Sequence, residues 1–178
     1  GDYYGTYRAM QKALEAGKVR AIGLSNFVDA RFVDLVENME VKPAVLQLET
    51  HVFSQQKRMR ELMAPYGTRL MAWAPLAEGR NGIFTHPTLT VIGAKYGKTA
   101  AQTALRFLMA EDVIAIPKSV HRERLVENFS IDDFELSAED LDAIRALDGG
   151  KPMFADFNDP TLAKFLLEYD AKFNPERQ

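Results

Sequence analysis

The sequence contains no cysteine, a single tryptophan and only three histidines. Without cysteine there can be neither a disulfide framework nor a thiolate nucleophile, which fits a reducing compartment. His51, His86 and His121 are about 35 residues apart, with no carboxylate or histidine at ligand spacing, so no metal site is predicted. No segment has the features of a signal peptide or of a membrane-spanning helix, and we therefore expect a cytoplasmic protein that binds no membrane.

The charge pattern also excludes a class of partner. The net charge is −3, and the basic residues are scattered along the chain, so nucleic acid is not an expected ligand. With 178 residues, 47% of them hydrophobic, the chain can bury the core of one domain. It opens on Gly1-Asp2-Tyr3-Tyr4, already in a helical pattern and without an initiator methionine, which we interpret as a cut or a truncation.

Four short apolar runs punctuate the chain, and each predicts a buried strand because it is nearly continuous rather than alternating. They cover residues 19–24, 44–48, 70–74 and 113–116. Helical patterns lie between them, with Thr99 and Ser137 as expected N-caps and Gly149-Gly150 as the expected end of the last regular helix. This alternation predicts a parallel sheet.

Such a sheet is either doubly wound or part of a barrel. No Gly-x-Gly-x-x-Gly follows any strand, which weighs against the doubly wound dinucleotide fold. A (β/α) barrel needs eight strands and about 250 residues, whereas four strands are predicted here. We therefore predict an α/β fold that is the C-terminal half of a (β/α)8 barrel, with residues 1–150 as the half-barrel and residues 151–178 as a tail.

A phosphate site is predicted directly after the last strand. Lys118 and Ser119 leave the strand end, and Arg124 follows one helical turn later, so three phosphate-seeking groups lie near a helix N-terminus. A basic helix face is usually only solvated surface. A Lys-Ser pair directly after a buried strand is more specific, whereas His121 and Arg122 are expected to face solvent.

Together with the run 17–27, this segment closely resembles the aldo-keto reductases, which reduce carbonyl compounds with NADPH. The resemblance covers about residues 1–155 and the second half of the family's barrel only. It implies that Lys118, Ser119 and Arg124 hold the 2′-phosphate of NADPH and that Asn128 contacts the adenine.

The resemblance also implies a nicotinamide site at the ends of the first three strands. Ser25 and Asn26 would hold the carboxamide, Gln47 would complete that site, and Trp73 would stack on the nicotinamide ring. Leu76 lies in the loop expected to pass over the pyrophosphate.

Each of these residues also has a structural interpretation. Ser25-Asn26 could cap a helix over residues 28–38, Gln47 could be a polar group of the barrel interior, and Trp73 could simply belong to the core. For Glu49 and His51 we favour a structural role. The apolar tail folds over the barrel mouth in relatives, but for residues 160–173 we favour a helix that packs against the barrel exterior.

The family's catalytic tyrosine, lysine, aspartate and histidine belong to the first four strands of the barrel, and no tyrosine of this chain matches that motif. We therefore predict no catalytic residue here. The first hypothesis is that the chain is the cofactor-holding half of an NADPH-dependent reductase of small aldehydes or ketones, with the missing N-terminal half as its partner. The alternative is a non-catalytic half-barrel that binds nucleotide or associates with itself.

Overall fold

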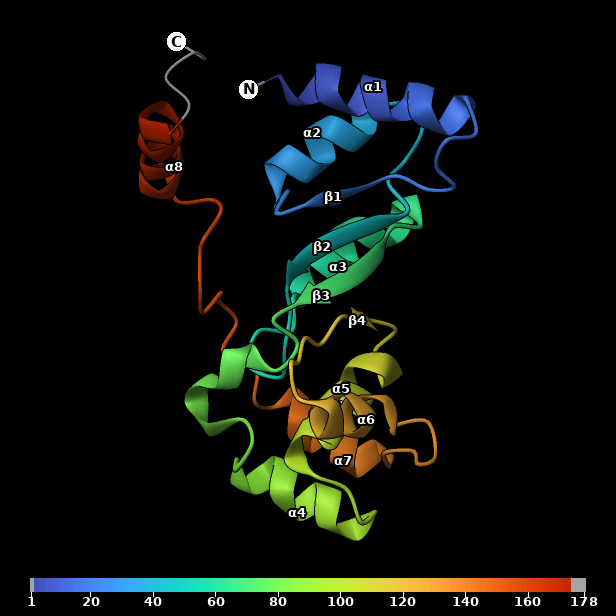
Figure 1. Cartoon of the computed structure of the whole chain (residues 1–178), viewed down its shortest axis with the longest axis vertical. Coiled ribbons are helices and arrows are strands. Elements are labelled where there is room, and N and C mark those ends of the chain that lie inside the picture. Colours follow the sequence, from blue (N-terminus) through green and yellow to red (C-terminus); the bar gives the residue numbers. More distant parts are fainter. Residues whose placement is uncertain (1, 174–178) are drawn as a thin grey trace.

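Four parallel strands form one sheet in the computed structural model, which describes residues 2–173 (Figure 1). The strands are β1 (Gly23–Ser25), β2 (Val45–Glu49), β3 (Arg69–Trp73) and β4 (Ile114–Ala115). Each pairs only with its neighbours in the chain, in the order β1-β2-β3-β4. A doubly wound sheet reverses its strand order, whereas a barrel does not. The predicted parallel α/β architecture with barrel connectivity is confirmed.

The first strand is shorter than the apolar run predicted. Pairing with β2 begins at Gly23, and Val19 has a 41% exposed side chain. Gly23 itself is tightly constrained, because a Cβ there would lie 2.7 Å from the carbonyl oxygen of Val45 on the neighbouring strand. Residues 19–21 therefore lead into the sheet without belonging to it.

Helices connect the strands and complete the chain. The α-helices are α1 (Tyr3–Glu15), α2 (Ala30–Asn38), α3 (Lys57–Met63), α4 (Pro87–Lys95), α5 (Ala100–Ala110), α6 (Arg122–Phe129), α7 (Ala138–Arg145) and α8 (Pro160–Phe173), and the 3-10 helices are η1 (Ala64–Tyr66) and η2 (Ala77–Gly82). Thr99 caps α5 in a reciprocal pair with Gln102, and Ser137 caps α7, as predicted. Helix α7 ends at Arg145, several residues before Gly149-Gly150.

The core lies between the sheet and the helices that cover it. Phe32 and Leu35 of α2, Leu46 of β2 and Phe107 of α5 are at most 1% exposed. Figure 1 shows α1 and α2 beside β1 at one end of the molecule and α4 to α7 beyond β4 at the other. Because the four strands are parallel, their carboxyl ends all lie on one side of the sheet.

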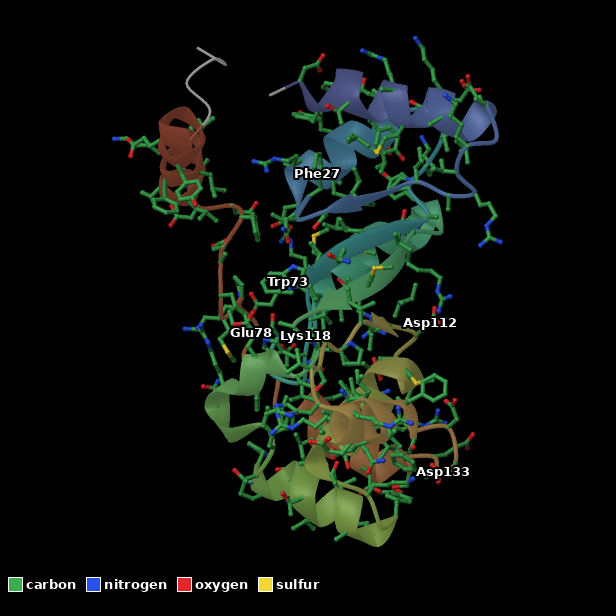
Figure 2. All side chains as sticks on the ribbon, viewed as in Figure 1. Phe27, Trp73, Glu78, Asp112, Lys118 and Asp133 are labelled. Carbon is green, nitrogen blue, oxygen red and sulfur yellow. The ribbon has the colours of Figure 1, made fainter. Side chains whose placement is uncertain are left out.

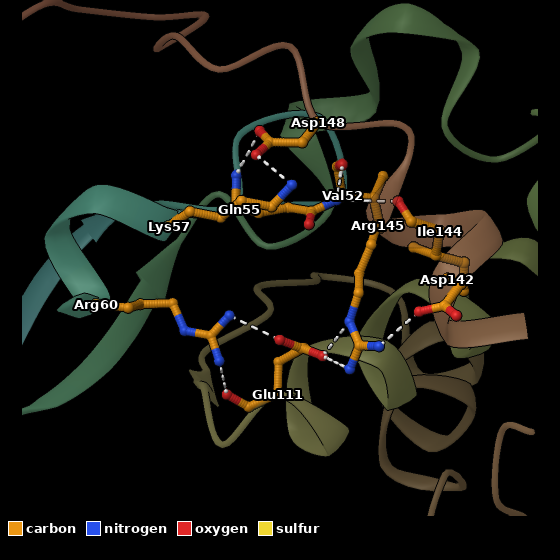
Figure 3. A network of polar contacts seen from close by, with 9 residues as sticks. All are labelled: Val52, Gln55, Lys57, Arg60, Glu111, Asp142, Ile144, Arg145 and Asp148. Carbon is orange, nitrogen blue, oxygen red and sulfur yellow. Dashed lines mark hydrogen bonds and ion pairs between the residues drawn. The ribbon is translucent and has the colours of Figure 1, made fainter. Parts of the chain in front are cut away.

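A partly buried polar network ties three helices together (Figure 3). The carboxylate of Glu111, at the end of α5, accepts hydrogen bonds from Arg60 Nη1 of α3 at 2.7 Å and from Arg145 Nε of α7 at 2.9 Å. Arg145 also bonds Asp142 at 2.8 Å. Nearby, the side-chain amide of Gln55 donates to the carbonyl oxygens of Val52 and Ile144. These contacts fix the segment after β2 against α7.

The tail does not follow the expected course throughout. Residues 160–173 form a helix, as predicted, but Figure 1 shows α8 standing apart from the other helices, and Phe165, Leu166 and Leu167 are 47–66% exposed. The expected packing of this helix against the barrel exterior is therefore wrong for residues 160–169, whose side chains the structure describes. No described helix is long and apolar enough to cross a bilayer.

Candidate cofactor-binding site

Polar and aromatic side chains gather where the strands end. Ser25 ends β1 and is paired in register with Gln47 of β2, and Trp73 is the last residue of β3. Lys118 follows β4 by three residues. Figure 2 shows Trp73 at the open edge of the sheet with Lys118 in the loop next to it. Parallel strands place their carboxyl ends on one side, which is where barrel proteins carry functional groups.

Asn26 links two of these strand ends. Its φ of +58° lies in the left-handed region that asparagine tolerates better than most residues, and its N–H donates to the carbonyl oxygen of Gln47 at 3.0 Å. Its Oδ1 accepts a 2.9 Å hydrogen bond from Trp73 Nε1. The helix-cap interpretation of Ser25-Asn26 is wrong, because α2 starts at Ala30 with Asp29 in the N-cap position.

Gln47 is half-buried and weakly bonded. Its Nε2 donates to the sulfur of Met71 on β3 at 3.1 Å, and sulfur is a weak acceptor. No partner for its side-chain oxygen is found within residues 2–173. The expected contact with a neighbouring strand is present, yet half of the amide remains available to a ligand.

Trp73 is half-buried, so it is not a core tryptophan. Its ring centroid lies 5.5 Å from that of Phe154, a residue of the tail, at an interplanar angle of 57°. The loop that follows β3 is unusual, because Ala74, Ala77 and Glu78 all have φ near +50°. Non-glycine residues in this region are costly, and such conformations cluster at ligand sites.

A cavity of about 370 Å³ lies beside the ends of β3 and β4. It gathers five residues that the sequence singled out, namely Leu76, Lys118, Ser119, Arg124 and Asn128. The remaining lining comes from Phe84, Thr99, Ala101 and Glu127. Residues from the loop after β3, from the start of α5 and from α6 thus meet around one space.

The cations of this cavity are free to bind an anion. Lys118 and Arg124 are exposed and have no ion-pair partner within the part of the chain that the structure describes. Ser119 Oγ accepts a hydrogen bond from the N–H of His121 at 3.1 Å, beside the start of α6. His121 and Arg122 are exposed, as expected. Two cations and a hydroxyl at a helix N-terminus suit a phosphate.

Sequence analysis missed one charged residue of this cavity. Glu127 lies one turn after Arg124 on α6, and its Oε1 accepts a 2.6 Å hydrogen bond from Thr99 Oγ1. The spacing of three residues from Arg124 places both on one helix face and was the available signal. Because an ionised carboxylate only accepts hydrogen bonds, Glu127 suits the exocyclic amine of a base as its ligand, and it would repel a phosphate.

Glu49 and His51 are buried, with 3% and 0% exposure, which agrees with a structural role. Glu49 Oε1 lies 3.1 Å from His51 Nε2, and its carboxylate accepts the backbone N–H groups of Met153 and Phe154. Burial alone would raise the pKa of Glu49, but the hydrogen bonds from His51, Met153 and Phe154 hold this pKa below its usual value. No sequence pattern indicated the contact with the tail.

Comparison with known proteins agrees with this geometry. The sequence model of the aldo/keto reductase family matches residues 2–149. The chain is 42% identical over 145 residues to glyoxal reductase of Bacillus subtilis. This alignment covers 82% of the chain and 52% of the relative. The chain is 37% identical over 167 residues to the NAD(P)H-dependent D-xylose reductase I,II of Candida tropicalis, covering 87% and 50%.

Solved structures give the same result. Gox0644 in its apo form superposes with a TM-score of 0.84 at 34% identity, covering 89% of this chain and 58% of that one. A Bombyx mori aldo-keto reductase in complex with NADP superposes with a TM-score of 0.79 at 31% identity, covering 89% and 55%. The chain spans about half the length of the curated relatives it matches. The match over residues 2–149, on a half-barrel of four parallel strands, shows that the chain belongs to the aldo/keto reductase family.

Proposed function

We propose that the protein carrying this chain reduces small aldehydes or ketones with NADPH, and that this half holds the cofactor. The observation that carries the proposal is the cavity that brings Leu76, Lys118, Ser119, Arg124 and Asn128 together. Lys118 would act as a point charge on the 2′-phosphate, and the guanidinium fork of Arg124 would bind two of its oxygens. Asn128 would contact the adenine.

The nicotinamide would bind at the neighbouring strand ends. Ser25, Asn26 and Gln47 offer a hydroxyl and two amides, which match the donor and acceptor of a carboxamide. Trp73 offers the aromatic face, and its bond to Asn26 fixes both side chains. NADPH would supply the hydride, while these residues orient the ring.

The proton donor would come from outside this chain. Carbonyl reduction needs a positioned acid beside the hydride acceptor, and general acid catalysis contributes about 10² to 10⁴ in rate. We assign no such residue to residues 1–178, and propose that the N-terminal half of the barrel supplies it. The lack of cysteine suits a reducing compartment such as the cytoplasm.

A specific surface supports a partner half. Beside β4, whose outer edge is unpaired among the described strands, Ile116, Leu125 and Phe129 are 44–83% exposed. Exposed apolar groups at an open sheet edge favour association. The same surface supports the second candidate function, a self-associating nucleotide-binding module.

Two nucleotides test the phosphate site without any catalysis. Adenosine 2′,5′-bisphosphate carries the 2′-phosphate, whereas ADP does not. Calorimetry on the protein that contains this chain should show at least about tenfold tighter binding of the former, since a charged contact is worth about 1.5 to 3 kcal/mol. Equal affinities would remove the basis for assigning Lys118 and Arg124.

A further inference from the structure

The tail is attached to the sheet by a buried carboxylate. Glu49 Oε1 accepts the N–H of Met153 at 2.5 Å, and its Oε2 accepts the N–H of Phe154 at 3.1 Å. These residues lie more than 100 positions apart in the sequence. A carboxylate that accepts backbone N–H groups away from water forms some of the strongest hydrogen bonds in proteins.

His51 fixes the orientation of this carboxylate. The N–H of Phe53 donates to His51 Nδ1 at 3.2 Å, so Nδ1 is the acceptor and the ring proton resides on Nε2. Nε2–H then points to Glu49 Oε1, 3.1 Å away. The ring is fully buried and cannot turn toward solvent.

The attached segment places an aromatic side chain beside the indole of Trp73. The ring centroid of Phe154 lies 5.5 Å from that of Trp73 and 6.2 Å from that of His51. Arg80, on the loop after β3, places its guanidinium 4.5 Å from the centroid of the Phe154 ring. The same stretch of tail, including Pro152 and Ala155, lines a 450 Å³ cavity that Asn26 and Glu49 also line.

We propose that Glu49 and His51 are positioning residues that hold Met153 and Phe154 in place, so that Phe154 forms a wall of the carbonyl-substrate site beside Trp73. This inference rests on the proposed function, which puts the nicotinamide on Trp73. Glu49 acts through the tail and does not itself contact the reacting atoms.

Hydrogen exchange in the full-length protein tests the attachment independently of activity. In Glu49→Gln the charge is lost and an amide group faces the tail N–H groups, so the amides of Met153 and Phe154 should exchange about tenfold faster. Glu61→Gln is the matched control, because that side chain is exposed and has no ion-pair partner among the described residues. The amide exchange rates in β2 and β3 should stay unchanged. A general loss of stability would instead raise the rates in these strands as well as in the tail.

A second variant covers the case in which Glu49→Gln does not fold. Met153→Pro changes the tail and not the sheet, and it removes the Met153 N–H that donates to Glu49. We expect the N–H of Phe154 to lose its bond to Glu49 as well and to exchange faster. Unchanged protection at residue 154 in Met153→Pro, or at residues 153 and 154 in a folded Glu49→Gln protein, would overturn the attachment.

Kinetics test the role of the wall. Loss of one aromatic pair is worth about 0.5 to 1.5 kcal/mol, so Phe154→Ala and Glu49→Gln should both raise KM for an aromatic aldehyde by about twofold to tenfold, with less effect on kcat. If the amides of Met153 and Phe154 exchange faster but KM does not change, Phe154 does not form a wall of the substrate site. A wild-type protein that shows the attachment but never oxidises NADPH would instead contradict the proposed function alone.

Discussion

The indole N–H of Trp73 donates a 2.9 Å hydrogen bond to Oδ1 of Asn26, and this bond joins the carboxyl end of β3 to that of β1 across β2. It leaves the Nδ2 group of Asn26 as a donor toward a ligand, and it holds the indole in one orientation. The two residues are 47 positions apart. They form a prearranged pair that suits a flat ring bearing a carboxamide.

NADPH should therefore quench the emission of Trp73. Stacking of the nicotinamide on the indole would place an absorbing ring in direct contact with the fluorophore. We expect a saturable decrease in emission on titration with NADPH, and loss of that decrease in Trp73→Phe, in which a phenyl ring can still stack. Binding followed by calorimetry should persist in this variant. An emission that NADPH leaves unchanged at saturation would place the nicotinamide elsewhere.

Arg124→Ala should discriminate between the two cofactors. Arg124 lines the cavity and has no ion-pair partner among the described residues. If it binds the 2′-phosphate as proposed, its loss would remove a charged contact that NADPH can make and NADH cannot. We expect NADPH affinity to fall by about 1.5 to 3 kcal/mol and NADH affinity to change little. Arg122→Ala, on the exposed face of the same helix, is the control. Equal losses for both cofactors would refute the assignment.

Glu111→Gln should lower stability in a pH-dependent way. Burial raises the pKa of Glu111, but the hydrogen bonds from Arg60 and Arg145 outweigh it and hold this pKa below the usual 4.5 (Figure 3). The ionised form is thus favoured in the folded state, so its contribution is complete above pH 4.5 and is lost as the pH falls through the lower, folded pKa.

Denaturant unfolding at several pH values measures this effect. Near neutral pH we expect Glu111→Gln to cost about 1 to 3 kcal/mol, with the difference from wild type shrinking in acid. Glu61→Gln, at an exposed residue of α3 without an ion-pair partner among the described residues, should change stability by less than about 0.5 kcal/mol. A difference that stays constant down to acid pH would exclude ionisation as the cause.

The 178-residue chain expressed alone should neither reduce aldehydes nor behave as a compact monomer. It offers no assigned proton donor, and Phe129 beside β4 is 83% exposed. Size-exclusion chromatography should show a dimer, an aggregate or an expanded species, and NADPH oxidation with a simple aldehyde should stay at background. A mass-verified chain that turned over NADPH would show that a proton donor exists within it.

Local sequence signals were sufficient for the existence of the four strands, for the helix caps at Thr99 and Ser137, and for the proximity of Lys118, Ser119 and Arg124. Buried strands are recognisable as runs of apolar residues. A residue such as Thr99 caps a helix through contacts with a residue only three positions away. Lys118, Ser119 and Arg124 are close in sequence, so their convergence depended on one short strand-loop-helix unit. The predicted start of the first strand was wrong, because pairing with β2 and not hydrophobicity decides where that strand begins. The predicted end of the last regular helix at Gly149-Gly150 was also wrong, because α7 ends at Arg145.

The tertiary structure alone decided what meets across long separations. The sequence placed Glu49 directly after the predicted strand 44–48, but it did not show that the Glu49 carboxylate binds Met153 and Phe154, more than 100 residues away. It also did not place Glu127 in the cavity with Lys118. Periodicity reports which face of one element is buried, whereas such contacts depend on how several elements pack together and on the course of the loops between them.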